Sequence, residues 1–295
     1  MGYADRDYMQ SGRGPGSGRP PGMPGPFEGA PITKWLLIIN IAVLIIDALL
    51  KAHPPLFLRD TWGYLSVDTA IFKGQIWRFI SFQFLHADFG HLLSNCIGIF
   101  FFGPHIERWM SSRPFLVFYL LSGLAGALFY TLLYFIPGVF EIYGADTRMV
   151  GASAGVFGIL ALFYFVAPDA RVLLFFVLPM KMRTLGIAFL AYETIKVVFV
   201  MDNAGGSAGH LGGIIFGVLF FKIPGVRAFV IKLSQIGTDS KRPPKIRAAR
   251  VVREEDRSPI ELSKEVDRIL DKISSEGIQS LTPKERESLD KARKK

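Results

Sequence analysis

Three separate apolar stretches of the sequence carry side chains of the types that acyl transfer needs. Ser153 lies in Gly151-Ala152-Ser153-Ala154-Gly155, His210 lies in a second Gly-rich run, and His91 with Asn95 lies in a third. A serine in such a helix can be purely structural, because small residues let membrane helices pack closely and the hydroxyl bonds its own backbone. Polar side chains at membrane depth are nevertheless expensive and usually functional. Their combination favours a hydrolase site built inside a bilayer.

Peptide hydrolysis by serine requires a nucleophile, a base within hydrogen-bond reach and donors for the oxyanion. Ser153 supplies the nucleophile, and we expect His210 to be its base because glycines surround both residues. Glycines let two membrane helices approach until a short serine side chain reaches an imidazole. We expect the glycines beside the serine, Gly151 and Gly155, to face those beside the histidine, Gly209, Gly212, Gly213 and Gly217.

Further hydrogen-bond donors would come from His91 and Asn95. These residues are four apart, so they share a helix face and can point at one oxygen. A helix that begins at Ser153 adds backbone N–H groups and a partial positive charge. No acidic residue is placed to orient His210, and the sequence therefore predicts a Ser–His dyad rather than a triad.

Other hydrolytic chemistries fit the sequence poorly. It contains no His-Glu-x-x-His motif, and His86 and His91 lie about 140° apart around a helix, so they would not chelate one ion. We interpret His86 as a structural histidine that bonds backbone at the end of a loop. The loop Tyr143-Gly144-Ala145-Asp146 lacks the Gly-x-Gly-Asp and second aspartate of an intramembrane aspartyl protease. The sequence thus predicts neither a metal nor a cofactor.

Composition places this chemistry in a membrane. Of the 295 residues, 50% are hydrophobic and 26 are Phe, and the mean hydropathy is +0.33, which indicates a polytopic membrane protein. The single cysteine, Cys96, excludes an intramolecular disulfide. The net charge is +9, and residues 222–295 hold 19 Lys and Arg against 12 Asp and Glu. We expect this basic tail to fix topology and touch anionic lipid rather than bind nucleic acid.

The chain divides into four regions. Residues 1–30 are rich in Gly, Pro and Arg and are expected to be disordered. Residues 31–222 hold six apolar stretches, 223–258 form a charged linker, and 259–295 form a helical tail. The predicted fold is an all-α polytopic membrane protein, in which six transmembrane helices form a bundle and the small helical tail is cytoplasmic.

The six predicted spans lie at about residues 35–50, 90–102, 115–136, 149–166, 184–200 and 207–222. We expect 171–182, around Pro179, to be an apolar connector that is partly re-entrant. Glu193 and Lys196 are three apart in the fifth span and are expected to pair along the helix. In the tail, 263–273 have helical spacing that stops at Gly277, and Thr282-Pro283 begins a second helix.

Charge in the short loops sets the predicted orientation. Those after the second and fourth spans contain Arg108, Arg113, Arg171, Lys181 and Arg183, whereas those after the third and fifth contain one basic residue, Arg148. The positive-inside rule then makes both termini cytoplasmic. The second, fourth and sixth spans each begin from the outer side, so their polar side chains converge near the outer face. Compactness and tail type suggest a bacterial inner membrane.

The residues resemble the rhomboid family of intramembrane serine proteases over about residues 35–222. Each short motif is weak, but their combination and order on separate spans are specific. The matching motifs are His86-x4-His91-x3-Asn95, Gly151-Ala152-Ser153 and Gly209-His210-x2-Gly213, together with Trp77-Arg78 in the first loop and Glu107 after the second span. Small departures occur at Ala154, often Gly in the family, and at Gly209, often Ala.

The resemblance implies a rhomboid-like bundle and assigns roles to these residues. Ser153 would be the nucleophile and His210 its base, while His91, Asn95 and the Ser153 amide would form the oxyanion hole. Phe157, where a Tyr is frequent, would pack on the base. The substrate would itself be a transmembrane segment, cleaved near its outer end, and a helix must unwind before its carbonyls can be attacked.

Two other functions compete with proteolysis. An inactive rhomboid-like protein that binds membrane clients would keep Trp77-Arg78 and the glycines but lose Ser or His, whereas both remain here. A transporter is disfavoured because the sequence has no inverted repeat and few charges along a pathway. The oligomeric state and the natural substrate do not follow from the sequence.

Overall fold

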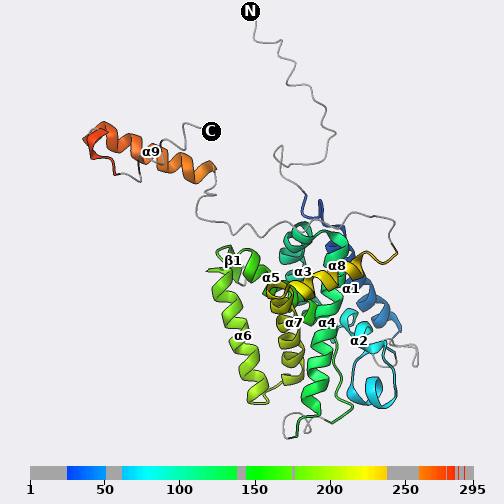
Figure 1. Ribbon diagram of the computed structural model, residues 1–295. Coiled ribbons are helices and arrows are strands. Elements are labelled where there is room, and N and C mark those ends of the chain that lie inside the picture. The colour runs from blue at the N-terminus through cyan, green and yellow to red at the C-terminus, as the bar shows by residue number, and fades with distance from the viewer. Residues whose placement is uncertain are drawn as a thin grey trace, which may run out of the picture.

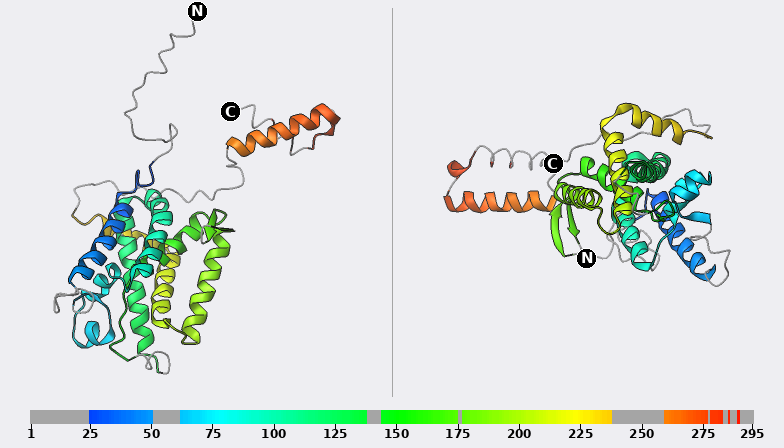
Figure 2. Two further views of the ribbon diagram at one scale, coloured as in Figure 1. Left: turned by 180° about the vertical axis from the view of Figure 1, so that it is seen from behind. Right: turned by 90° about the horizontal axis from the view of Figure 1, so that it is seen from below.

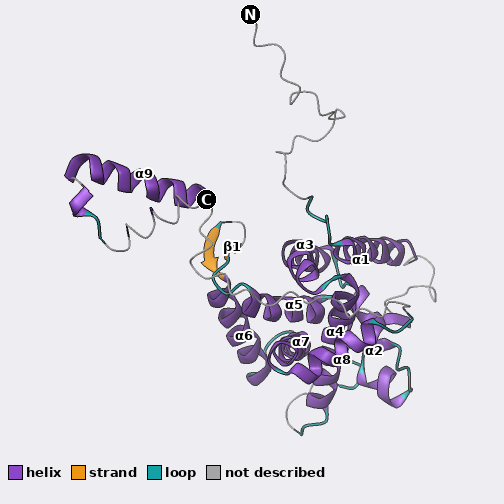
Figure 3. Cartoon of the chain, turned by 45° about the horizontal axis from the view of Figure 1, so that its top comes forward, coloured by secondary structure: helices purple, strands orange, loops and turns teal. Residues whose placement is uncertain are grey.

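The computed structural model is predominantly helical and describes residues 25–50, 62–137, 144–174, 177–237, 259–276 and 278–282, with Glu285 and Leu289 (Figure 1). The longer helices are α1 (Pro31–Leu50), α3 (Phe89–Met110), α4 (Ser112–Tyr134), α5 (Ser153–Val166), α6 (Met182–Val198), α7 (Ala204–Lys222), α8 (Pro224–Ser234) and α9 (Pro259–Glu276). Short helical turns are η3 (Asp68–Phe72), α2 (Arg78–Ser81), η4 (Phe82–Phe84) and η6 (Ile278–Ser280). Within the described residues, the strands β1 (Arg171–Leu174) and β2 (Leu178–Lys181) form one small hairpin (Figure 3).

The helix α5 lies at the centre of the bundle. It packs against α3, α4, α6 and α7, and in Figure 2 several of these helices are seen nearly end-on from below. Its sequence is apolar all round, which is the pattern of a helix buried on every side. Ile159 and Leu162 of α5 join Phe118 and Tyr119 of α4 and Phe220 of α7 in the main hydrophobic core. This central position brings the start of α5, at Ser153, among four other helices.

Each of the six predicted spans overlaps a helix, but not all of these helices are long and apolar enough to be identified as membrane spans by themselves. Among the described residues, three are long and apolar enough to cross a membrane: Pro31–Leu50, Ser112–Tyr134 and Ala204–Lys222. The helices α5 and α6 have 14 and 17 residues, and α3 carries Glu107 and Arg108 in its last turn. A helix of 14 residues is about 21 Å long, short of a hydrocarbon core of about 30 Å.

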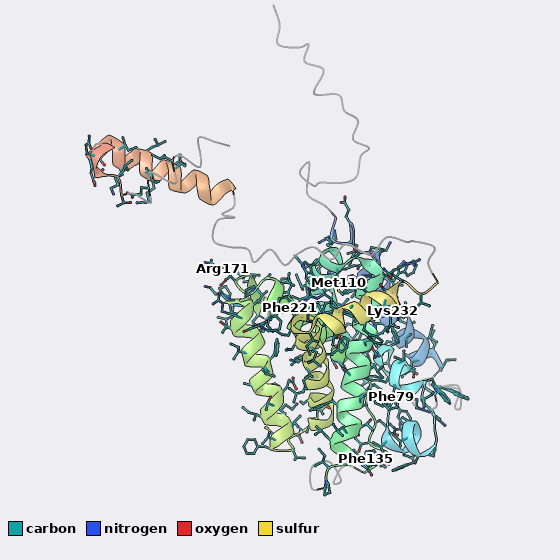
Figure 4. The ribbon with its side chains drawn as sticks, in the orientation of Figure 1. Phe79, Met110, Phe135, Arg171, Phe221 and Lys232 are labelled. Atoms are coloured by element: carbon teal, nitrogen blue, oxygen red, sulfur yellow. The ribbon has the colours of Figure 1, made fainter. Side chains whose placement is uncertain are left out.

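One end of the bundle is fixed by hydrogen bonds of Glu107. Its carboxylate accepts from the backbone N–H groups of Ile32 (2.9 Å) and Thr33 (2.7 Å) and from the Thr33 hydroxyl (2.7 Å). These bonds satisfy donors that would otherwise be orphaned at the start of α1. The end of α3 is therefore joined to the beginning of α1. In Figure 4, Met110, Arg171 and Phe221 lie towards this end of the bundle and Phe135 towards the other.

Residues 25–30, which the sequence assigns to a disordered segment, form a turn at the same end. The Arg108 guanidinium donates to the carbonyls of Glu28 (2.8 Å), Gly25 (3.2 Å) and Pro26 (2.8 Å). The three bonds from Arg108 hold this Gly- and Pro-rich turn in place, and the composition of the turn alone gives no sign of them. The predicted boundary at residue 30 is therefore too late.

The segment assigned to a charged linker from residue 223 begins with helix α8. Pro224 occupies the first turn, where its missing N–H has no partner to lose. Val230 is fully buried, and Val226 packs against the main core, so apolar residues four apart anchor the helix. Arg227 donates to the carbonyl of Phe221 (2.6 Å) at the end of α7. The predicted linker boundary at 223 is therefore too early, because helical residues continue to Ser234.

The connector 171–182 is a β-hairpin rather than a partly re-entrant segment. Arg171 pairs with Lys181 and Leu174 with Leu178 in antiparallel register. Asp169 pairs with Arg183 and lies 3.5 Å from Lys181, which ties the base of the hairpin to the start of α6. Alternating exposure along Arg171–Leu174 is typical of a strand that covers the bundle with one face only.

The tail contains α9, and the predicted second start at Thr282 carries a capping box. The Thr282 amide donates to Glu285 (2.9 Å), and the Glu285 amide donates to the Thr282 hydroxyl (3.3 Å). Arg268 and Lys272 of α9 pair with the same carboxylate at 3.1 and 3.2 Å. The predicted stop at Gly277 lies outside the described residues.

Candidate active site

The start of α5 depends on a glycine that no other residue type would replace easily. Gly151 has φ +128°, and its N–H donates to the carbonyl of Phe82 (2.9 Å). A Cβ built on Gly151 would lie 2.7 Å from Nε2 of His91 and 3.5 Å from Oγ of Ser153. The imidazole of His91 and the hydroxyl of Ser153 therefore flank the same point, and glycine is the residue that leaves room for both.

His210 lies against α5 one helical turn beyond Ser153. Its ring stacks on Phe157, with centroids 4.2 Å apart and planes 14° from parallel. The backbones of α5 and α7 touch next to this stack, where a Cβ on Gly213 would collide with the carbonyl of Ala154. One turn further on, a Cβ on Gly217 would lie 2.8 Å from the carbonyl of Gly158. The structure thus brings the predicted base onto the helix that the predicted nucleophile begins.

The glycine partners differ from those expected. Gly155 faces the ring of Tyr119 on α4, with 2.5 Å from its Cβ position to Cε2. Gly209 faces Met149 (3.3 Å) and Gly212 faces the carbonyl of Ala125 (2.5 Å). The prediction that Gly151 and Gly155 face the α7 glycines is therefore wrong. The prediction assumed that all the glycines of a helix lie on one face. Successive glycines along a helix instead point in different directions and contact different neighbours.

His91 and Asn95 share one side of α3, as their spacing predicts. Asp88 caps this helix by accepting from the His91 amide (2.8 Å). The Ala87 amide donates to Nδ1 of His91 (3.5 Å), which leaves Nε2 to carry the proton of the neutral ring. Nδ2 of Asn95 donates to the backbone carbonyl of His91 (3.1 Å), so part of its donor capacity is used within α3.

Three of the remaining candidates brace the approach to the site. His86 is buried, its ring meets that of His91 edge-on at 5.2 Å, and burial lowers the pKa of His86 to about 4. Nε1 of Trp77 donates to the carbonyl of Trp62 (3.2 Å). Arg78 is buried and donates to the carbonyl of Tyr64 (2.7 Å). These contacts hold the connection before α3 in place. Glu107 lies at the other end of the bundle and is not part of this cluster.

The sequence missed an acidic residue beside His210. Oε1 of Glu193, on α6, lies 3.1 Å from Nδ1 of His210 on α7. Oε1 is within hydrogen-bond distance of Nδ1, although the contact is not well aligned. The prediction that no acidic residue approaches His210 is therefore wrong. Lys196, the expected partner of Glu193, instead lies over the ring of Tyr192 (5.5 Å).

The described residues offer no group of three or more His, Cys, Asp or Glu side chains that could hold a metal ion. An apolar cavity of about 600 Å³ lies between α1 and the segment before α3. Its lining residues are Ile39, Val43, Trp62, Gly63, Trp77, Ser81, Phe84 and Leu85. This cavity is separate from the Ser153–His210 cluster and presents almost no polar group that would orient a substrate.

Comparison with known proteins assigns most of the bundle to one family. The family model described as a rhomboid domain matches residues 73–225, and a family of unknown function matches residues 260–295. The first match contains every residue of the candidate site, including Glu193. The second covers the tail described above.

Several curated proteins are similar over the same region. The chain is 33% identical to RHOMBOID-like protein 12, mitochondrial, of Arabidopsis thaliana, over 62% of this chain and 55% of that protein. It is 31% identical to Rhomboid protein 1, mitochondrial, of Saccharomyces cerevisiae, over 63% and 51%. It is 26% identical to the rhomboid protease AarA of Providencia stuartii, over 64% and 70%. The similarity thus spans about half the length of the first two relatives.

Proposed function

Because the chain belongs to the rhomboid family, we propose that it is an intramembrane serine endopeptidase that cleaves transmembrane segments of other membrane proteins near the outer face. One observation carries the proposal. The His210 ring stacks on Phe157, one turn after Ser153, where Gly213 brings the backbones of α5 and α7 into contact. A histidine held in this way on the helix of an intramembrane serine has the placement required of a general base.

The proposed reaction passes through an acyl-enzyme. Nε2 of His210 takes the proton of the Ser153 hydroxyl as Oγ of Ser153 forms a bond to the scissile carbonyl carbon. The carbon–nitrogen bond then breaks, and the imidazolium returns that proton to the leaving amine. Water then attacks the ester as His210 takes one of its protons. The bond between the carbonyl carbon and Oγ of Ser153 breaks, and His210 returns the proton to Oγ, which releases the new carboxyl end and restores Ser153. No cofactor takes part in this proposal.

The oxyanion would be stabilised from two sides of Gly151. The proton on Nε2 of His91 lies on the side of the ring that approaches Gly151 and Ser153. The Ser153 amide belongs to the first turn of α5, where N–H groups have no intrahelical acceptor. Asn95 retains one donor hydrogen beyond its bond to the His91 carbonyl. We propose these three groups as the oxyanion hole.

Helix lengths support a common depth for the reacting groups. If α5 ends at the inner surface, its length of about 21 Å leaves Ser153 about 9 Å below the outer surface of a 30 Å core. His210 is six residues into α7, which is also about 9 Å from that helix's outer end. Glu193 is five residues before the end of α6. These counts support a common depth for all three side chains.

We propose six spans with both termini in the cytoplasm of a bacterial cell. Basic residues lie at the end of α3, the start of α4, the hairpin, the start of α6, the end of α7 and in α8: Arg108, Arg113, Arg171, Lys181, Arg183, Lys222, Arg227 and Lys232. Arg171 and Lys232 lie towards the Glu107 end of the bundle in Figure 4, which supports that end as the cytoplasmic one. Two similar proteins are named as mitochondrial. Fractionation of the native host, with protease access to a tag on each terminus, tests the compartment and orientation together.

Reaction with a fluorophosphonate probe tests the enzyme assignment. Full-length protein in liposomes should be labelled, and Ser153→Ala and His210→Ala should abolish both labelling and cleavage of single-span proteins reconstituted with it. Ser122→Ala is the matched control, because this buried serine on α4 donates to the Phe118 carbonyl (2.8 Å) within its own helix. Wild-type protein that binds single-span proteins but neither reacts nor cleaves would instead identify an inactive client-binding member.

A further inference from the structure

Three buried polar side chains meet where α6 packs against α7. Glu193 contributes its carboxylate from α6, and Ser207 and His210 contribute a hydroxyl and an imidazole from successive turns of α7. Glu193 is 4% exposed and Ser207 is fully buried. Oε1 of Glu193 lies 3.1 Å from Nδ1 of His210, and the Ser207 hydroxyl approaches the same carboxylate. This cluster joins α7, which carries His210, to α6, which supplies no residue to the reaction proposed above.

A purely structural role explains this cluster poorly. Within the described part of the chain, Glu193, Ser207 and His210 contact one another, but Oε2 of Glu193, Oγ of Ser207 and Nδ1 of His210 lack a well-aligned hydrogen bond. Unpaired buried polar atoms are destabilising, and an apolar residue would pack α6 on α7 at lower cost. An ionisable side chain at membrane depth is therefore expected to serve a function through the partner that it contacts.

We propose that Glu193 is a positioning residue for His210, which makes the catalytic group a Ser–His–Glu triad rather than a dyad. This inference rests on the proposed protease function. Oε1 of Glu193 would accept the Nδ1–H of His210, and so keep the lone pair of the neutral ring on Nε2, the nitrogen that must accept the serine proton. When Nε2 takes that proton, the carboxylate stabilises the imidazolium. Glu193 itself gains no proton.

The surroundings of His210 restrict the ring in two directions. Phe157 covers one face at a centroid distance of 4.2 Å, and Phe157 in turn meets Phe189 of α6 edge-on at 5.6 Å. Glu193 approaches the Nδ1 edge, so Nε2 is directed away from α6. A small rotation of the ring within its stack aligns Nδ1–H with the carboxylate. Catalytic hydrogen bonds are often misaligned without substrate and tighten when it binds.

The charges near His210 come from three helices. Glu193 of α6 is the acidic group in contact with it, and Lys196 lies one turn further along α6. His91 of α3 lies close enough for its ring to interact electrostatically with His210. From α5 the neighbour is the uncharged ring of Phe157. Removal of Glu193 therefore leaves the imidazolium with cationic or neutral neighbours.

The test is steady-state cleavage by Glu193→Gln across a range of pH, with full-length protein in liposomes. We expect kcat to fall about tenfold or more with KM nearly unchanged, because Glu193 acts through His210 and does not touch substrate. The acidic limb of the kcat profile should move to lower pH, because the imidazolium loses its anionic neighbour. Glu193→Asp, which keeps the charge but is one methylene shorter, should recover part of the rate and return the limb towards the wild-type position.

Lys196→Gln is the matched control, because it changes charge one turn away on the same helix. Its kcat should stay within about twofold of wild type, and its acidic limb should stay in place or move to slightly higher pH. A Glu193→Gln variant with wild-type kcat and an unmoved limb would overturn the inference, while Ser153-dependent cleavage by wild type would leave the protease proposal standing. Wild-type protein without Ser153-dependent cleavage would instead overturn the proposed function itself.

Discussion

Two buried glutamates of this bundle have opposite surroundings. Glu107 is fully buried between α3 and α1, and its two oxygens accept three hydrogen bonds from Ile32 and Thr33. Glu193 is 4% exposed between α6 and α7, and one of its oxygens has no formed hydrogen bond among the described residues. The first faces two backbone N–H groups and a threonine hydroxyl, none of which titrates near neutral pH. The second faces an imidazole that can.

The difference separates two uses of the same side chain. A carboxylate whose acceptors are all used by the first turn of a helix is a cap, and its charge also suits the positive end of that helix. A carboxylate with unused capacity beside a titratable ring is unfavourable for stability but can respond when the ring gains a proton. We therefore expect substitutions at Glu107 to lower stability and substitutions at Glu193 to lower rate.

The largest expected effect is at the contact between α5 and α7, the helix that carries His210. Gly213→Ala places a methyl group against the Ala154 carbonyl, where a Cβ has no room. Forcing α7 away from α5 should lower the free energy of unfolding by about 3 kcal/mol and abolish cleavage. Gly225→Ala is the matched control, since nothing lies within 4 Å of its Cβ position. Thermal unfolding in detergent measures the loss of stability, and fluorophosphonate labelling measures the loss of activity. Equal stability and labelling of the two variants would disprove close packing of α5 on α7.

Substitution of the two glutamates by glutamine is expected to change the free energy of unfolding by an intermediate amount. Glu107→Gln replaces one acceptor by an NH2 group that faces the donors of α1, so we expect a loss of about 1–3 kcal/mol in unfolding free energy. Glu193→Gln removes a buried charge that is only partly paired, and its unfolding free energy should change by less than about 1 kcal/mol. Thermal unfolding of both variants under one set of conditions makes the measurement. A larger loss for Glu193→Gln would assign it the structural role instead.

The sequence predicted helix positions well because apolar periodicity is a local property. The start of α6 at Met182 lies two residues from the prediction, and that of α7 at Ala204 lies three. The fourth span was predicted from Met149, but α5 begins at Ser153, because Gly151 with φ +128° holds the preceding residues outside the helix. Short amphipathic α8 was missed, since its apolar residues alternate with Arg227 and Lys232.

Partners across the bundle could not be predicted, because spacing along one helix says nothing about its neighbours. Glu193 and Lys196 have the spacing of an intrahelical pair, yet packing turns Glu193 towards His210. Gly155 has the spacing of a helix–helix contact motif, yet it accommodates Tyr119 rather than α7. The serine, histidine and asparagine of the candidate site could be proposed from their chemistry alone, whereas Glu193 beside His210 is visible only from the packing of α6 on α7.

The smallest expected effect concerns a third glutamate, which is paired like Glu107 but lies in the tail. Hydrogen bonds from Thr282 lower the pKa of Glu285 to about 2, with a further contribution from Lys272. A depressed pKa means that this contribution to stability is present above about pH 4.5 and is lost as the pH falls towards 2. Glu285→Gln should therefore speed amide exchange around Ile269 of α9 at pH 7, by a modest factor because exposed ion pairs contribute little.

The difference in exchange between wild type and Glu285→Gln should shrink as the pH is lowered through that window, because the wild-type carboxylate is then protonated. Glu276→Gln is the charge-matched control, since Glu276 makes no ion pair within the described residues of the tail. If Glu285→Gln and Glu276→Gln changed the exchange rate equally, or if the difference from wild type persisted at pH 2, the effect would come from net charge and not from the capping box. The capping role would then be confined to Glu107, whose donors are buried with it and do not depend on solvent exposure.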